Sequence, residues 1–115
     1  MTLHELIAAL GLRELTPIGD GNDVISHGYA SDLLSDVLAH APAGGVLVTL
    51  QVHLNVIAVA SHAGMRAVIF SSSRMPDDEI IERATAEGLS LLSSSADTFE
   101  IVGRLYESGI RGGGA

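Results

Sequence analysis

The second half of the chain alternates short apolar runs with amphipathic segments, and this alternation constrains the fold more than any other feature. Apolar runs at 46–50, 66–70 and 89–93 lie between stretches whose apolar residues have helical spacing. Apolar runs without polar alternation are typical of strands buried on both faces. Strands that alternate with helices form parallel sheets through right-handed crossovers. We therefore predict an α/β fold, with a mixed or mostly parallel sheet of about five strands and helices on both faces.

The predicted elements begin and end at recognisable signals. Thr2 and Glu5 have the spacing of a capping box, and Gly11 would end that first helix. Ser31 is the predicted N-cap of the second helix, with Asp32 in its first turn. The predicted helices cover residues 2–11, 31–41, 55–64, 77–88 and 94–109, and two further strand candidates cover 12–18 and 24–30.

The length and the charge of the chain limit its organisation and its partners. A chain of 115 residues has the size of one domain, and we predict one domain over residues 1–110 with a flexible tail at 111–115. The net charge of −8 would repel nucleic-acid phosphates and anionic membrane surfaces. No apolar run approaches the ~18 residues of a membrane span, and the N-terminus lacks the basic segment of a signal peptide. We therefore expect a cytoplasmic protein that binds neither nucleic acid nor membrane.

The residue types that are missing exclude several kinds of chemistry. The chain has no Cys, and all six of its basic residues are Arg. Without Lys there is no Walker A phosphate loop and no Schiff-base chemistry, and without Cys there is no thiolate nucleophile or disulfide. The five histidines lack the i, i+4 spacing of a helical zinc site. We therefore expect a non-enzyme without catalytic residues, metal or cofactor, which does not turn over ATP.

Polar residues follow the predicted strands at four strand-to-helix junctions. In a parallel sheet these junctions lie together at the carboxyl edge, where open α/β sheets bind ligands. Helix N-termini at this edge favour anions, and Arg74 adds a basic side chain. We therefore predict a binding site for a small anionic or nucleotide-like ligand. Its candidate residues are Tyr29, Ser31, Asp32, Gln51, His53, Asn55, Ser72, Arg74 and Ser94.

Helix capping is the alternative explanation for the same polar residues. Capping alone would account for the two serine triplets at 71–73 and 93–95, because Ser before a helix satisfies its free N–H groups. One helix needs one cap, however, whereas Gln51, His53 and Asn55 place three polar groups at alternate positions. Both explanations stay open for these three residues.

Catalysis and association are the competing functional hypotheses. In the predicted second helix, Asp32 and Asp36 lie one turn apart on one face, where a carboxylate pair could bind a cation or act as acid and base. A small enzyme would use Asp32, His53 and serine residues at the same edge of the sheet. A contact between His27 and His53 is a further arrangement that we considered. A mean hydropathy of +0.38 predicts more apolar surface than one core hides, so we expect a homodimer. A purely structural protein-interaction module is the remaining alternative.

Two segments carry a resemblance to a known family. The segment "GYASDLLSDVLAHAPAGGVLVTLQVHLNVIAVAS" is similar to the middle of DRTGG-type domains, and "DTFEIVGRLYESGI" is similar to their C-terminal helix. These domains resemble the N-terminal domain of HPr kinase/phosphorylase, which implies the corresponding α/β fold. The resemblance covers nearly the whole chain. It implies a stand-alone regulatory or ligand-sensing domain.

The chain departs from that family in two ways. In the segment "DVISHG", His27 replaces a glycine of the family signature and the usual Arg is missing. The kinase relatives carry their phosphate loop in a separate C-terminal domain, which this chain does not contain. The resemblance therefore implies no kinase activity for these residues.

Overall fold

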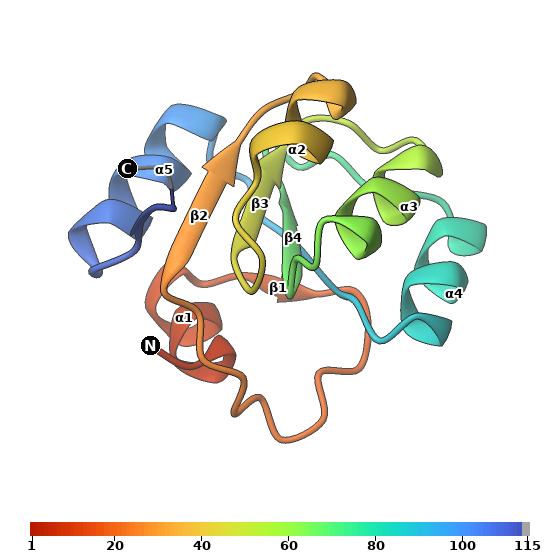
Figure 1. Ribbon diagram of the computed structural model, residues 1–115. Helices are drawn as coiled ribbons and strands as arrows, with labels where there is room; N and C mark the ends of the chain where they lie inside the picture. Colours follow the sequence, from red (N-terminus) through yellow and green to blue (C-terminus); the bar gives the residue numbers. More distant parts are fainter. Residues whose placement is uncertain (114–115) are drawn as a thin grey trace.

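A six-stranded sheet forms the centre of the molecule (Figure 1). The computed structural model describes residues 1–113. Every pair of neighbouring strands is parallel except β1 and β5, which are antiparallel. In spatial order the strands are β1 (Arg13–Glu14), β5 (Ser90–Ser93), β4 (Ala67–Phe70), β3 (Val46–Thr49), β2 (His27–Ala30) and β6 (Arg111–Gly112). The predicted α/β fold with a mostly parallel sheet is confirmed.

Helices cover both faces of the sheet, as predicted. The five helices are α1 (Leu3–Leu10), α2 (Leu34–His40), α3 (Asn55–His62), α4 (Asp78–Ala86) and α5 (Thr98–Glu107). The connections from β2 to β5 all step in the same direction across the sheet, so right-handed crossovers place α2, α3 and α4 on one face. Figure 1 shows α1 and α5 on the other side. The chain therefore forms three layers.

Alternate residues of the central strands point into two separate cores. Val46 and Val48 of β3 pack with residues of α1 and α5, whereas Leu47 packs with residues of α2, α3 and α4. All four residues of β3, β4 and β5 are buried, which explains their continuous apolar sequences. Phe70 is the largest of the fully buried side chains, in a core that is otherwise aliphatic.

The C-terminal end of the described chain differs from our expectation. Arg111 and Gly112 form β6, which pairs with His27 and Gly28 of β2. We had assigned these two residues to a flexible tail; residues 114 and 115 of that tail lie outside the described residues. The helix α5 leads from β5 across the face of the sheet to its opposite edge, and β6 therefore becomes a sixth strand.

The helix signals are partly confirmed. Thr2 and Glu5 form the predicted capping box, and Gly11 ends α1 in the left-handed conformation. The second helix is present, but its predicted start and N-cap were wrong, because α2 begins at Leu34 and its N-cap, Leu33, has no side-chain hydrogen bond. No helix among residues 1–113 has both the length and the apolar character to cross a membrane.

Candidate functional site

Asp32 connects the ends of β2 and β3. Its Oδ1 accepts hydrogen bonds from the Thr49 hydroxyl at 2.9 Å and from the Leu50 backbone N–H at 2.7 Å. Its backbone carbonyl accepts from the side-chain amide of Gln51 at 3.1 Å. Thr49 is fully buried, and its Oγ also accepts from the Gln51 backbone N–H at 3.1 Å. The structure thus brings Asp32 and Gln51 together, and their polar groups bind within the domain.

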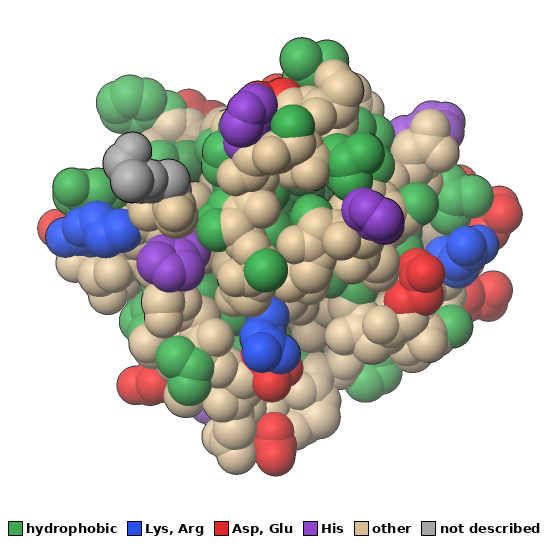
Figure 2. Space-filling view, in the orientation of Figure 1, with side chains coloured by type: hydrophobic (Ala, Val, Ile, Leu, Met, Phe, Trp, Pro, Cys, Tyr) green, Lys and Arg blue, Asp and Glu red, His purple; other side chains and the backbone are tan. Residues whose placement is uncertain are grey.

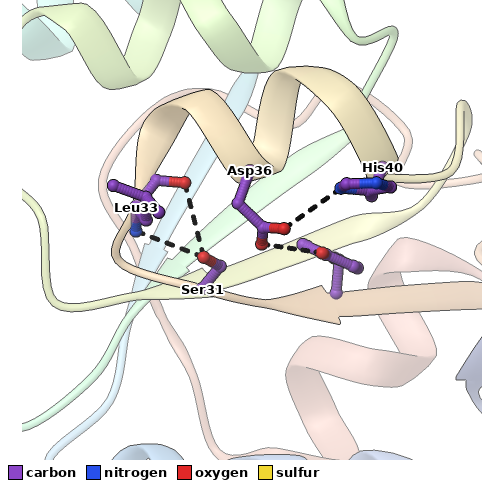
Figure 3. A network of polar contacts seen from close by, with 5 residues as sticks. Ser31, Leu33, Asp36 and His40 are labelled. Atoms are coloured by element: carbon purple, nitrogen blue, oxygen red, sulfur yellow. Dashed lines mark hydrogen bonds and ion pairs between the residues drawn. The ribbon is translucent and has the colours of Figure 1, made fainter.

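Asp36 belongs to a different network, shown in Figure 3. Its carboxylate accepts from the Tyr29 hydroxyl at 2.7 Å and lies 3.1 Å from Nδ1 of His40. Ser31 lies nearby, where its Oγ accepts from the Leu33 N–H at 3.2 Å. The predicted pairing of Asp32 with Asp36 was wrong, because Asp32 precedes α2 and turns toward β3.

The Tyr29 hydroxyl and the Asp36 carboxylate shift each other's pKa in opposite directions. The hydrogen bond from Tyr29 is the main cause that lowers the pKa of Asp36; Ser31 and His40 lower it further, whereas partial desolvation opposes them. The same hydrogen bond is the main cause that raises the pKa of Tyr29. Because the carboxylate pKa is lowered on folding, ionised Asp36 stabilises the fold above its ordinary pKa. This contribution is lost as the pH falls through the lowered value.

We expect Tyr29→Phe to move the pKa of Asp36 back toward the ordinary carboxyl value, because the substitution removes the main cause of the shift. The loss of stability at acid pH should then be smaller, because Asp36 would bind its proton at nearly the same pH in the folded and the unfolded state. An NMR titration of the Asp36 carboxyl carbon measures the change, with Tyr106→Phe as the matched control. An unchanged Asp36 pKa in Tyr29→Phe would contradict the assignment.

His53 closes the turn that leads into α3. Its Nδ1 accepts from the Asn55 backbone N–H at 3.1 Å, and both residues are exposed. The N-cap of α3 is Leu54, which makes no side-chain hydrogen bond to the helix. His53 also does not pack beneath the helix. His27 and His53 are not brought together, because His27 begins β2 whereas His53 follows the end of the parallel strand β3.

The two serine triplets do not cap the helices that follow them. Asp77 accepts from the backbone of α4, and Asp97 accepts from the backbone of α5. The capping explanation for the triplets was therefore wrong. Instead, the loops after β4 and β5 are hydrogen-bonded to each other: the Ser73 N–H donates to the Ser94 carbonyl at 2.8 Å, and the Ser72 N–H donates to the Ala96 carbonyl at 2.8 Å.

The loop after β4 has an unusual backbone. Ser72 and Ser73 both adopt the left-handed conformation, with φ of 56° and 58°. This conformation costs a residue with a Cβ roughly 1–2 kcal/mol. Non-glycine residues in this region cluster at functional sites, where surrounding contacts hold them. Here the hydrogen bonds to the loop after β5 hold both residues.

A cavity of about 300 Å³ lies beside these loops. Serine side chains and one arginine provide its polar wall. The lining residues are Gly11, Arg13, Ser73, Met75, Ser93, Ser94 and Ser95. Arg13 reaches this position because β1 pairs with β5, where Arg13 lies opposite Ser93. Because no lining residue is acidic, the cavity has the chemistry to accept an anion.

The nine predicted site residues fall into two groups. Ser94 lines the cavity, and Ser72 and Arg74 lie in the loop that forms one of its walls. The other six lie at the ends of β2 and β3: Tyr29, Ser31, Asp32, Gln51, His53 and Asn55. Arg13 was missed, since a pairing between residues 80 positions apart leaves no local signal. Among residues 1–113, no three His, Asp or Glu side chains come close enough to hold a metal ion.

The chain matches no protein-family model and no curated protein in the searches of these two kinds. Among solved structures, it is similar to the crystal structure of the CBS and DRTGG domains of the regulatory region of Clostridium perfringens pyrophosphatase, complexed with the activator diadenosine tetraphosphate. The TM-score is 0.74 at 13% identity, over 93% of this chain and 46% of the other. The chain thus spans about half of that regulatory region. At this identity the likeness supports a DRTGG-like fold, and the further similarity to HPr kinase stays a prediction.

Proposed function

We propose that this domain is a non-catalytic regulatory module that binds a small anionic or nucleotide-like ligand. The ligand would occupy the cavity lined by Arg13 and the serines of the β4 and β5 loops. The cavity carries the proposal, because it lies at the carboxyl edge of the sheet, where open α/β folds bind ligands. Its volume of about 300 Å³ is at the lower end of the range for small-molecule sites.

The chemistry of the lining supports an anion that carries an apolar part. The planar guanidinium of Arg13 can donate two parallel hydrogen bonds to a phosphate or a carboxylate. The serine hydroxyls can donate or accept, so they suit the remaining oxygens. Met75, which is 45% exposed, adds a flexible apolar surface against which a base or a sugar could pack.

Two further observations support a binding role. Ser72 and Ser73 adopt a backbone conformation that Gly would adopt without strain. Serine at these positions lowers the stability of the fold, so a functional role of its side chain would explain its presence. In addition, the pyrophosphatase regulatory region of similar fold was crystallised with a nucleotide activator. Among the other predicted residues, the exposed His53 and Asn55 stay candidates for contact with a longer ligand.

We expect a phosphate-bearing ligand to raise the melting temperature of the domain, and Arg13→Gln to weaken that binding about 10- to 100-fold. The loss corresponds to one charge-assisted hydrogen-bonded contact. At a ligand concentration of 100 Kd, the unmodified domain should gain about 2.7 kcal/mol. Thermal denaturation and calorimetry with inorganic phosphate, AMP, ATP and diadenosine tetraphosphate measure the effect.

Arg66→Gln is the matched control, since Arg66 precedes β4 at the opposite edge of the sheet and its removal changes the net charge equally. Both variants should fold, because the two arginines are exposed. The proposal fails if none of the four compounds binds. It also fails if binding is equally strong in Arg13→Gln and Arg66→Gln.

We also propose that the domain associates as a homodimer. The high mean hydropathy predicted this from the sequence. Large apolar side chains that stay exposed on α5 support it.

A further inference from the structure

The outer face of α5 carries three large exposed apolar side chains. Phe99, Val102 and Tyr106 are 88%, 39% and 59% exposed. Their spacing of three and four residues places them on one side of the helix, which we call the α5 stripe. Together with Thr98 and Gly103 they line a shallow, mainly apolar groove. Figure 2 shows hydrophobic side chains projecting at the left, where α5 lies in Figure 1.

The α5 stripe is only partly used by the fold of the single domain. A neighbouring side of the helix supplies the core residues Ile101 and Leu105, which are almost fully buried. Val102 and Tyr106 also line a small pocket beside β2, whereas Phe99 projects into solvent. Isolated exposed apolar residues are ordinary, whereas an adjoining set on one helix marks an interaction surface.

We propose that the α5 stripe packs against α5 of a second copy of this chain. The two helices run antiparallel about a two-fold axis that passes between Val102 and Gly103. This inference rests on the proposed homodimer and is independent of the proposed ligand. Under this symmetry Phe99 faces the partner's Tyr106, and Val102 faces the partner's Gly103.

The order of residues along the stripe makes it complementary to itself. An aromatic residue stands at each end, so the antiparallel arrangement forms two aromatic pairs. Between them, Val102 is a projection and Gly103 is a gap, because a Cβ at Gly103 would meet nothing within 4 Å. Glycine weakens a helix relative to alanine, and it permits the close approach of another backbone. A two-fold axis places each projection in the partner's gap.

The charges beside the stripe also select a second copy. With its N-cap, α5 and β6 (residues 97–112) hold three acidic residues, Asp97, Glu100 and Glu107, and two basic residues, Arg104 and Arg111. This region thus has a charge of only −1, whereas the whole chain has a net charge of −8. Repulsion between two copies is therefore weakest here.

Contacts within one copy order the side chains that border the stripe. Arg104 Nε lies 3.1 Å from Glu100 Oε1 within the helix. The Arg111 guanidinium stacks 3.8 Å from the centre of the Tyr106 ring and orients it.

Sedimentation velocity at micromolar concentration tests the interface. The unmodified chain should sediment as a dimer of the 11.9 kDa protein. Phe99→Glu and Val102→Glu should each weaken association at least about 30-fold, as expected for an interface anchor. Phe99→Glu should fold normally, since its side chain is 88% exposed, and circular dichroism checks the fold of Val102→Glu, whose side chain is 39% exposed. Leu38→Glu on α2 is the matched control, because Leu38 is 48% exposed on the other face of the sheet and should leave the dimer intact.

The gap at Gly103 tests the antiparallel geometry. Gly103→Leu should weaken the dimer, because the new side chain would meet the partner's Val102, whereas a single copy has room for it. A monomeric unmodified chain would overturn the homodimer and this interface together. A dimer that survives Phe99→Glu and Val102→Glu would overturn the α5 interface alone and would leave the homodimer standing.

Discussion

Replacement of Phe70 by alanine should lower the free energy of unfolding by about 3–5 kcal/mol. Phe70 ends β4, is completely buried and is the largest of the fully buried side chains. Its removal loses the transfer free energy of the ring and leaves a cavity that the surrounding strands fill only partly. Since small domains have a total stability of about 5–15 kcal/mol, the variant loses a large share of it.

Urea denaturation of Phe70→Ala and Phe70→Leu measures this loss. Leucine keeps an apolar side chain of similar position, so it should cost less than about 1.5 kcal/mol. Phe70→Ala should also disturb the candidate site, because the backbone carbonyl of residue 70 accepts from the Ser94 N–H at 3.0 Å. A loss below about 1 kcal/mol in Phe70→Ala would mean that the ring does not fill the core as described.

The second large effect is expected at Asp32. Asp32→Ala should lower the free energy of unfolding by about 2 kcal/mol, because it removes the partner of the buried Thr49 hydroxyl and of the Leu50 N–H. His53→Ala should cost less, since it removes a single hydrogen bond on an exposed turn. From the sequence alone, both side chains would count as exposed polar residues worth about 0.5 kcal/mol or less.

Asp32→Asn is the matched control for the charge, since its amide oxygen can still accept both hydrogen bonds. It should retain most of the stability that Asp32→Ala loses. Thermal and urea denaturation of the three variants give the comparison. Equal stability of Asp32→Ala and the unmodified domain would show that the contact with β3 contributes nothing, and would return Asp32 to the candidate ligand residues.

The central strands and the helices could be predicted because their signals are local. Apolar runs of β3, β4 and β5 reflect burial on both faces, and they need no knowledge of distant residues. The edge strands had no such signal. Arg111 and Gly112 belong to a glycine-rich segment that pairs with β2, 84 residues earlier in the chain. A two-residue pairing at that separation depends on where α5 leads the chain.

The candidate site follows from the sequence only at the level of the sheet edge. The rule for parallel strands places both serine loops at this edge, where Ser94 lines the cavity. That the cavity binds a ligand stays a prediction. The role of each polar residue was harder to predict, because each polar group had several possible hydrogen-bond partners. Ser31 had the local features of an N-cap, yet Asp32 next to it binds Thr49 and α2 starts later. Asp77 and Asp97, rather than the serines, satisfy the helix N-termini.

The brevity of both edge strands has a consequence for aggregation. The segments "VLVT" and "AVIF" have the apolar, uncharged composition that favours amyloid-like stacking when their backbone is accessible. In the folded domain the two edge strands are only two residues long and carry charged side chains, Arg13 and Glu14 on β1 and Arg111 on β6. They therefore offer little template for a strand of another molecule. Truncation of the chain before Arg111 would remove β6. The longer edge of β2 would then be exposed and could pair with a strand of another molecule.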